Sequence, residues 1–189
     1  MQQHAFIVTD LGFGDAGKGS VVDYLARMPD AHTVVRYNGG AQAAHNVVTP
    51  DGRHHTFAQF GSGTFSPDVR TYLSRFMLLE PLGMMAEERH LKTLGVSDAF
   101  ARTTVDRDAL VVTPFHRAAN RLREIARSGG RHGSCGIGIG ETAATHLAYG
   151  DRVLFARDLL NRRTMESKLQ FLRDVKRETL LDQIAVVPQ

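Results

Sequence analysis

The residues from which chemistry is expected begin with a glycine-rich turn that carries one lysine. Residues 12–20 read Gly-Phe-Gly-Asp-Ala-Gly-Lys-Gly-Ser, which fits the pattern G-x-x-x-x-G-K of phosphate-binding loops. Glycines let the backbone turn tightly, so that N–H groups and a helix N-terminus face an anion, and Lys18 adds a positive charge. The sequence therefore predicts phosphate binding here. The alternative is an ordinary glycine turn with a surface lysine.

One position in this turn departs from the pattern. Gly19 follows the lysine, where the pattern has the Ser or Thr whose hydroxyl binds magnesium. We expect Asp15 to replace that hydroxyl, because a carboxylate among phosphates is repelled unless it meets a cation or takes part in proton transfer. The alternative is that Asp15 caps the following helix.

A second turn carries a histidine. Residues 38–46 read Asn-Gly-Gly-Ala-Gln-Ala-Ala-His-Asn and follow the predicted strand 33–37. Strand ends on one side of an α/β sheet face a common crevice, so this turn is expected beside the first. There His45 would stabilise transferring charge or donate a proton; the alternative is a surface histidine. The remaining histidines are interpreted as surface residues: His4, His32, His54, His55, His90, His116, His132 and His146.

A third glycine-rich segment covers residues 131–142. Its glycines and Ser134 suit a second anion-binding turn, and two such turns suggest two phosphorylated ligands. An ordinary flexible loop is the alternative. Cys135 is not assigned as a nucleophile, since no basic partner can be identified for it.

The predicted elements place these turns in an α/β fold. Apolar, β-branched runs predict strands at 5–9, 33–37, 53–60, 71–79 and 109–113. Helical spacing and Pro or Gly boundaries predict helices at 20–27, 81–94 and 114–127, with 153–184 mostly helical. We expect a mainly parallel sheet with helices on both faces and a P-loop-like phosphate-binding turn after the first strand. Residues 1–150 would form a nucleotide-binding α/β domain, and 151–189 a charged helical extension of it.

Composition narrows the class of protein. The 189 residues are 42% hydrophobic with a formal net charge of +3, and we find no signal peptide and no run long enough to cross a membrane. The single cysteine, Cys135, suits a reducing compartment. We therefore expect a soluble, cytoplasmic protein that binds neither membranes nor nucleic acid. The arginines at 117, 121, 123, 127 and 131 are interpreted as the solvated face of a helix.

Together the segments resemble the adenylosuccinate synthetase family. Residues 12–20 resemble that family's G-x-W-G-D-E-G-K-G-K, and Val34-Val-Arg-Tyr-Asn-Gly-Gly-Ala-Gln-Ala-Ala-His45 resembles its V-V-R-Y-x-G-G-H-N-A-G-H. The glycines from Gly133 to Gly140 resemble its T-T-G-x-G-I-G segment, which contacts the phosphate of inosine monophosphate (IMP). The motifs occur in the family's order.

The resemblance implies an activity and site residues. The family joins aspartate to IMP with GTP and magnesium (Mg2+), through a 6-phosphoryl intermediate in purine nucleotide biosynthesis. The resemblance implies that Asp15 is the general base and a magnesium ligand. It also implies that His45 assists as an acid and that the Ala44 carbonyl completes the metal site. The implied GTP-binding residues are Gly14, Asp15, Ala16, Gly17, Lys18, Gly19, Ser20, Ala44, His45 and Asn46. The implied IMP-binding residues are Asp15, Ala16, Gly17, Lys18, Gln42, Ala43, Ala44, His45 and Cys135.

Two classes of function follow. Ala16, Ala41, Gln42 and Cys135 replace the family's glutamate, histidine, asparagine and threonine, so a related purine nucleotide or amine is an alternative substrate. Because family members are longer, the first hypothesis is a GTP-dependent C–N ligase that is complete only with a missing C-terminal half or another subunit. The second is a non-catalytic or partner-dependent purine-nucleotide-binding module. The resemblance also implies a homodimer.

Overall fold

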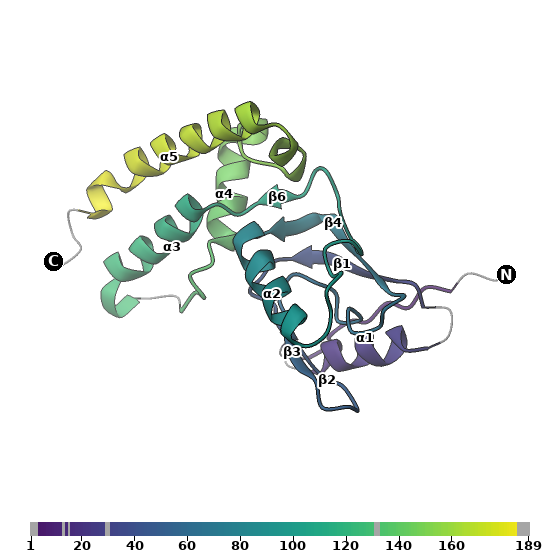
Figure 1. The fold of residues 1–189 in the computed structure, drawn as a ribbon. Helices are drawn as coiled ribbons and strands as arrows, with labels where there is room; N and C mark the ends of the chain where they lie inside the picture. Colours follow the sequence, from purple (N-terminus) through teal and green to yellow (C-terminus); the bar gives the residue numbers. More distant parts are fainter. Residues whose placement is uncertain (1–3, 13, 15, 29–30, 131–132, 185–189) are drawn as a thin grey trace.

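A parallel β-sheet forms the centre of the computed structural model, which describes residues 4–12, 14, 16–28, 31–130 and 133–184. Its strands are β1 (Thr33–Gly39), β4 (Arg70–Leu79), β5 (Thr103–Val105) and β6 (Leu110–Val111). β4 pairs in parallel with β1, β5 and β6 and so lies between them. The predicted α/β fold with a parallel sheet is confirmed (Figure 1).

In the described residues, five α-helices and a hairpin surround the sheet. The helices are α1 (Lys18–Ala26), α2 (Pro81–Thr93), α3 (Pro114–Ala126), α4 (Ile139–Tyr149) and α5 (Arg162–Ile184). The hairpin joins β2 (His45–Val48) to β3 (His54–Phe57), and short 3-10 helices cover Ser128–Gly130, Gly150–Arg152 and Ala156–Leu160. α1 and the hairpin lie at one end of the molecule, and α3, α4 and α5 at the other (Figure 1). No helix in the described part of the chain combines the length and the apolar character needed to cross a membrane.

The predicted first strand is not formed. Residues 4–10 have no regular secondary structure, and within the described chain no strand pairs with them. Phe6 and Ile7 are 65% and 88% exposed, whereas strands of parallel sheets are normally covered on both faces. A strand is stable only with a neighbour to pair with, and apolar composition alone does not supply one. The predicted strand at 5–9 is therefore wrong for this structure.

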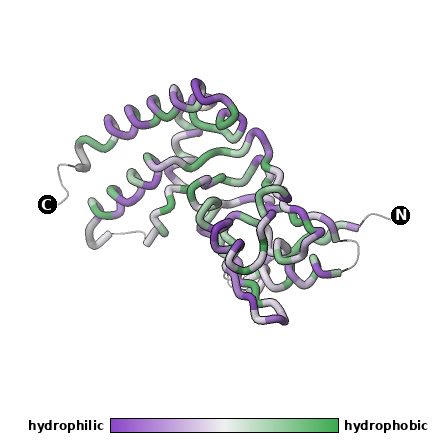
Figure 2. The backbone as a smooth tube through the Cα atoms, in the orientation of Figure 1, coloured by the Kyte–Doolittle hydropathy of each residue, from purple (hydrophilic) through white to green (hydrophobic). Residues whose placement is uncertain are grey.

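The core lies between the sheet, α2 and α5. Phe57, Phe60, Leu73, Leu91 and Leu172 are fully buried in one cluster. Figure 2 shows the hydrophobic stretches running through the strands, while α5 alternates between hydrophobic and hydrophilic residues. Because Leu172 of α5 joins the same cluster, the C-terminal helix packs on the core of the sheet. The proposed boundary at residue 150 remains a prediction.

Two of the histidines interpreted as surface residues are buried. His116 accepts the Thr113 backbone N–H at Nδ1 (3.1 Å), and burial, with nearby Lys176, lowers the pKa of His116 to about 3. His55 contacts Glu87 through Nε2 (3.3 Å) and His90 through Nδ1 (2.8 Å). Both predictions are wrong because these rings complete a helix cap and a buried polar network, roles that single positions in a sequence do not reveal. His132 lies outside the described residues.

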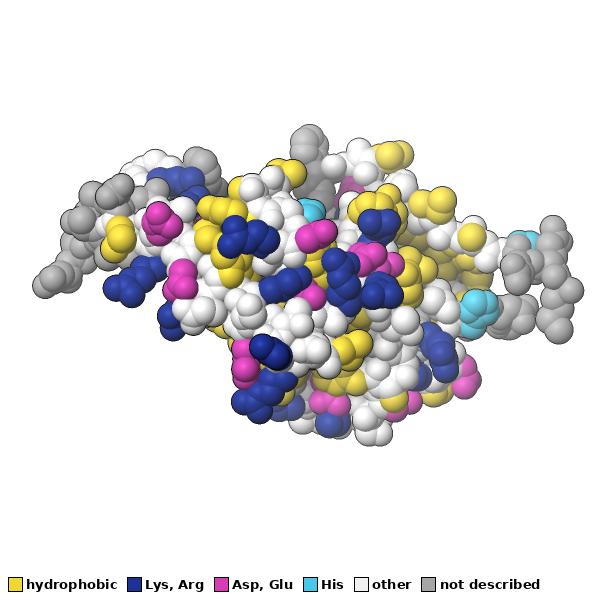
Figure 3. Space-filling model, turned by 90° about the horizontal axis from the view of Figure 1, so that it is seen from above, with side chains coloured by type: hydrophobic (Ala, Val, Ile, Leu, Met, Phe, Trp, Pro, Cys, Tyr) yellow, Lys and Arg dark blue, Asp and Glu magenta, His cyan; other side chains and the backbone are white. Residues whose placement is uncertain are grey.

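Two arginines of α3 and Arg127 at its C-terminal cap are paired with acidic side chains. Arg117 contacts Glu80 (3.3 Å), Arg123 contacts Glu141 (3.1 Å) and Arg127 contacts Glu124 (2.7 Å). Seen from above, basic and acidic side chains are interspersed over the surface (Figure 3). The solvated-face prediction is therefore wrong at Arg117 and Arg123, because the packing of neighbouring elements brings carboxylates to them. Arg131 lies outside the described residues.

One ion triad holds the three C-terminal helices together. The Glu141 carboxylate of α4 contacts Arg123 of α3 (3.1 Å) and Lys176 of α5 (2.9 Å), and the Glu141 and Lys176 side chains are about one-tenth exposed or less. Removing the central charge would leave two cations without compensation in a poorly solvated site.

We therefore expect Glu141→Gln to lower the free energy of unfolding by about 3 kcal/mol. The measurement is urea denaturation followed by circular dichroism. Glu166→Gln is the matched control, because Glu166 forms an exposed pair with Arg162 on α5 and should cost less than about 1 kcal/mol. Equal losses in the two variants would contradict a structural role for the triad.

Candidate functional site

The first glycine turn leads directly into the N-terminus of α1. Gly17 precedes the helix with φ 76° and ψ 19°, and its carbonyl accepts the Val21 N–H (3.1 Å). Gly14 has φ 111°. Both residues lie in the region of backbone conformation that favours glycine. The turn therefore presents the first N–H groups of α1, which have no acceptor within the helix, at the position where an anion binds most readily.

Lys18 lies over this turn and is held by two groups. Its ammonium forms an ion pair with Asp10 and donates to the Gly14 carbonyl (2.9 Å). Asp10 also accepts the Gly12 N–H (2.8 Å). The hydrogen bond from Lys18, followed by that from Gly12, holds the pKa of Asp10 below its usual value. The sequence prediction missed Asp10; its signal was an Asp two residues before a glycine, the pattern of a side chain that accepts a backbone N–H at i+2.

The first and second turns touch at Gly19. A Cβ atom added there would lie 2.7 Å from His45 Cβ and 3.1 Å from the Asn46 carbonyl oxygen. The Ser20 hydroxyl donates to that same carbonyl (3.5 Å). The structure therefore brings His45 and the first turn of α1 side by side, as expected from the order of elements, although contacts of α1 with β2 accomplish it and the first predicted strand is not formed.

His45 is half-buried at the start of β2, where it is paired with Phe57 of β3. Burial lowers the pKa of His45, and the positive charges of Arg36 and Lys18 lower it further. The imidazole is therefore neutral near pH 7 and can donate one hydrogen bond. A phosphate close to it would oppose this shift, because nearby negative charge stabilises the protonated ring.

Arg36 supports the second turn from inside the sheet. It is buried on β1 and donates to the carbonyls of Phe60 and Ala43, each at 3.3 Å. Burial lowers its pKa. The sequence prediction did not assign a role to this residue, although a charged side chain within an apolar strand signals a group with fixed partners. Arg36 thus fixes the backbone that carries the predicted ligand-binding residues.

The third segment adjoins the second. A Cβ added at Gly40 would lie 2.5 Å from Ile139 Cδ1, and one at Gly138 would lie 2.7 Å from the His116 carbonyl carbon. Asn120 of α3 donates to the Ser134 hydroxyl (3.0 Å). Residues 133–138 therefore pack along α3, while the start of α4 lies against the second turn.

The structure brings some of the predicted site residues together and leaves others apart; Gly14, Ala16 and Gly17 are exposed on the first turn. Lys18, Gly19, Ser20, His45 and Asn46 are brought together by the contact between α1 and β2. Gln42, Ala43 and Ala44 are exposed on the second turn, and Cys135 is exposed on the third segment; no contact found in the described chain joins Cys135 to Lys18 or His45. Asp15 lies outside the described residues. Among the residues that are described, no cluster of three His, Cys, Asp or Glu side chains could hold a metal ion.

Comparison with known proteins decides which family this arrangement represents. Residues 7–186 match the model of the adenylosuccinate synthetase family. The chain belongs to this family. It is 34% identical over 168 residues to adenylosuccinate synthetase of Chlorobaculum parvum, covering 88% of this chain and 37% of that protein. It is 31% identical over 179 residues to the enzyme of Clostridium botulinum strain Langeland, covering 94% of this chain and 40% of that protein.

Solved structures show the same fold. The fully ligated adenylosuccinate synthetase of Plasmodium falciparum superposes with a TM-score of 0.74 at 20% identity, over 92% of this chain and 40% of that chain. Succinoaminodeoxyadenylate synthetase of cyanophage S-2L, bound to dGMP and to dATP as energy donor, has a TM-score of 0.60 at 21% identity, over 82% of this chain and 41% of that chain. This chain therefore spans about two-fifths of the relatives' length.

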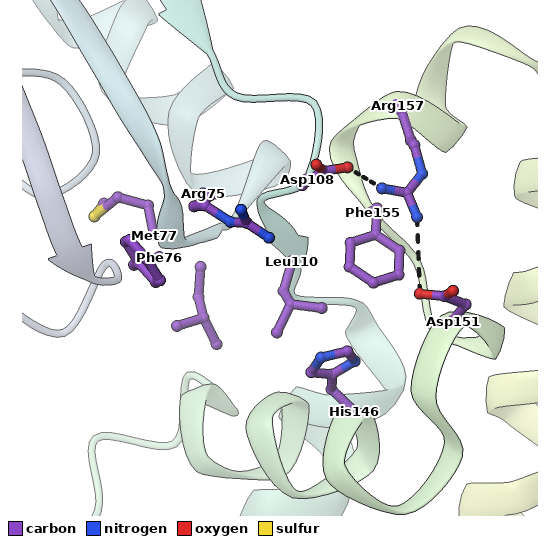
Figure 4. Close-up of a pocket in the computed structure, with 10 residues that line it drawn as sticks. Arg75, Phe76, Met77, Asp108, Leu110, His146, Asp151, Phe155 and Arg157 are labelled. Carbon is purple, nitrogen blue, oxygen red and sulfur yellow. Dashed lines mark hydrogen bonds and ion pairs between the residues drawn. The ribbon is translucent and has the colours of Figure 1, made fainter.

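Neither of two surface hollows in the described part of the chain is lined by residues of all three family motifs. The larger, of about 580 Å³, lies between β4, β6 and α4, and Arg75, His146 and Phe155 are among its lining residues (Figure 4). None of the predicted site residues lines it. A second hollow of about 400 Å³ is lined by Ala16 and Lys18 together with apolar residues of 6–9 and α1. The assignment of the site therefore rests on the geometry of the turns rather than on cavity size.

The contact at Gly19 yields a test of this geometry. We expect Gly19→Ala to destabilise the protein by about 1–3 kcal/mol, because the added methyl group must push α1 away from β2. Thermal or urea unfolding measures the loss. Gly12→Ala is the control in the same turn, since its Cβ would make only an ordinary contact, 3.5 Å from Asp10 Oδ1. A Gly19→Ala variant as stable as Gly12→Ala would show that the two turns do not touch.

Proposed function

We propose that the turn at residues 12–20 binds the terminal phosphates of GTP, and that this chain is the phosphate-handling part of a ligase that joins aspartate to IMP. The observation that carries this proposal is the approach of His45 to α1 at Gly19. It puts a lysine, a helix N-terminus and a neutral imidazole around one place, which suits the charge that develops in phosphoryl transfer. The reaction itself, in which aspartate is joined to IMP, is proposed from family membership.

Lys18 and His45 would divide the work at the transferring phosphoryl group. Lys18 opens α1 and would neutralise phosphate oxygens together with the N–H groups of the first turn. His45, whose pKa is lowered by burial, Arg36 and Lys18, would act first as a neutral hydrogen-bond donor. Arriving phosphate charge would raise its pKa and make it a better proton carrier.

Magnesium would be held mainly by phosphates and by one carboxylate, as is usual for this ion. Asp10, a described carboxylate at the turn, is already paired with Lys18, so Asp15 would be the protein ligand and the base for the purine. The Ala44 carbonyl, on the exposed second turn, would add an oxygen. When bound, the ion would neutralise negative charge on the phosphates.

The second nucleotide would lie along the second and third turns. Gln42 and Ala43 are exposed beside His45, and the third segment reaches the second turn through Ile139. IMP is the nucleotide proposed from family membership. The dATP-using cyanophage relative makes the base of the phosphoryl donor worth testing directly, with ATP compared with GTP.

Completion of the activity would require further polypeptide on the open face of β1. Val35 and Tyr37 of this parallel strand are 56% and 63% exposed, whereas parallel strands are normally covered on both faces. The relatives continue well beyond the two-fifths of their length that this chain matches. We therefore propose that a polypeptide carrying the rest of the family fold packs on this face. Homodimerisation and a cytoplasmic location are proposed on family membership alone.

Nucleotide binding tests the first part. With magnesium present, we expect GTP and IMP to bind, and Lys18→Met to weaken GTP binding by about tenfold or more, because a charge-assisted contact to phosphate is lost. Isothermal titration calorimetry measures both. Lys92→Met, at a surface pair with Glu88 on α2, should leave the affinity unchanged. Absence of binding by the unmodified chain would refute the proposal.

Turnover tests the second part. We expect no GTP- and aspartate-dependent product from this chain alone, and product when a polypeptide carrying the remaining part of the Chlorobaculum parvum relative is added. Tyr37→Lys should prevent this restoration without changing GTP affinity, because it places a charge in the apolar contact. Val48→Lys, at an exposed site on the β2–β3 hairpin, is the control. Turnover by the chain alone would contradict the need for a partner.

A further inference from the structure

Asp10 occupies the groups that a phosphate on the first turn would use. One carboxylate oxygen accepts the Gly12 N–H (2.8 Å), and the other forms the ion pair with Lys18. A carboxylate between a backbone N–H and a lysine ammonium resembles a phosphate oxygen in charge and in hydrogen bonding. Lys18 can satisfy a phosphate fully only when it leaves this partner.

We propose that Asp10 is an internal competitor for phosphate, which lowers the affinity of the turn by holding Lys18. The inference rests on the proposed function of residues 12–20. It differs from the roles given to Asp15, because Asp10 acts here by occupying a cation rather than by binding metal or moving a proton.

The local structure explains why Asp10 competes effectively. The Gly12 N–H fixes the orientation of the carboxylate two residues away, so little rotamer freedom is lost when the ion pair forms. The Asp10 and Lys18 side chains are 12% and 28% exposed, so water screens the pair only in part. Lys18 is also tied to the Gly14 carbonyl (2.9 Å), which keeps its ammonium over the turn rather than in solvent.

The proposed competition predicts the direction in which the affinity for phosphate changes when Asp10 is replaced. Removing the charge of Asp10 frees Lys18 for phosphate, so binding becomes tighter. If Asp10 instead helped to hold magnesium or the nucleotide, removing its charge would weaken binding. Asp10→Asn and Asp10→Ser both keep an acceptor for the Gly12 N–H and remove the negative charge, so a change common to both reports the charge rather than the shape of the turn.

The experiment is calorimetric titration of the full chain with inorganic pyrophosphate, and then with GTP, each with magnesium. Pyrophosphate has no base, so its binding reports the phosphate turn alone. We expect Asp10→Asn and Asp10→Ser to bind pyrophosphate roughly three- to tenfold more tightly than the unmodified chain, the range for a partly exposed charge pair. In the Lys18→Met background the same substitutions should give no gain, because the competed group is gone.

Asp51→Asn is the matched control. Asp51 also lies on a turn, accepts from Thr49 and pairs with an adjacent basic residue, Arg53, but it belongs to the β2–β3 hairpin. The affinity of the Asp51→Asn variant for pyrophosphate should equal that of the unmodified chain. Urea midpoints of all variants verify that each one folds.

The outcomes separate this inference from the proposed function. If the unmodified chain binds and the Asp10 variants bind equally or more weakly, the competitor role is overturned while phosphate binding stands. If neither the unmodified chain nor the variants bind pyrophosphate or GTP, the phosphate-binding proposal itself fails. Binding by the variants alone would support both, with strong competition.

Discussion

The absence of a side chain at position 19 is the constraint on which the arrangement of the site depends. α1 and β2 approach so closely that a single methyl group at Gly19 would overlap His45. The approach joins the N-terminus of a helix to the start of a hairpin strand, elements that share no hydrogen-bonded ladder. Gly40 and Gly138 make comparable close contacts with Ile139 and with the start of α3. The three glycine-rich turns are therefore packing surfaces as well as ligand-binding candidates, because a Cβ atom at these positions would overlap a neighbouring side chain or backbone.

Within the described chain, the central strand of the sheet is covered and the edge strand β1 is not. β4 is paired on both sides and its residues Leu73 and Met77 are buried, whereas β1 is paired with β4 alone in the described chain and exposes Val35 and Tyr37. The N-terminal apolar residues next to the first turn are exposed too. The sheet is thus open on one side in a chain that matches two-fifths of its relatives' length, and the turn that leads to His45 follows the open strand β1 directly. This is why nucleotide binding and turnover are expected to separate.

Sequence patterns predicted the elements whose boundaries are marked by residues within or next to the element itself. Proline and glycine boundaries gave α2 and α3 to within a residue or two, and the family motifs pointed to the turns that the structure brings together. The failures share one physical cause, namely dependence on distant partners. The apolar run at 5–9 needs a neighbouring strand, the burial of His55 and His116 depends on α2, α3 and α5, and the short strands β2 and β5 exist only because β3 and β4 lie beside them. Asp10 and Arg36 were overlooked for the same reason, since their importance lies in what they contact.

The charges around the first turn form a balanced set rather than a simple positive site. Arg36 is buried and bound to carbonyls. Burial is the main cause that lowers the pKa of His45, and the charges of Arg36 and Lys18 lower it further, so a further positive charge is disfavoured there. Asp10 offsets part of this field at Lys18. A phosphate that replaced Asp10 at Lys18 would bring more negative charge to the turn than the carboxylate does. The protonation of His45 and the release of Lys18 would then be coupled, because both respond to the charge that occupies the turn. Burial, Arg36 and Lys18 thus favour a neutral imidazole, and a phosphate on the turn would act in the opposite direction.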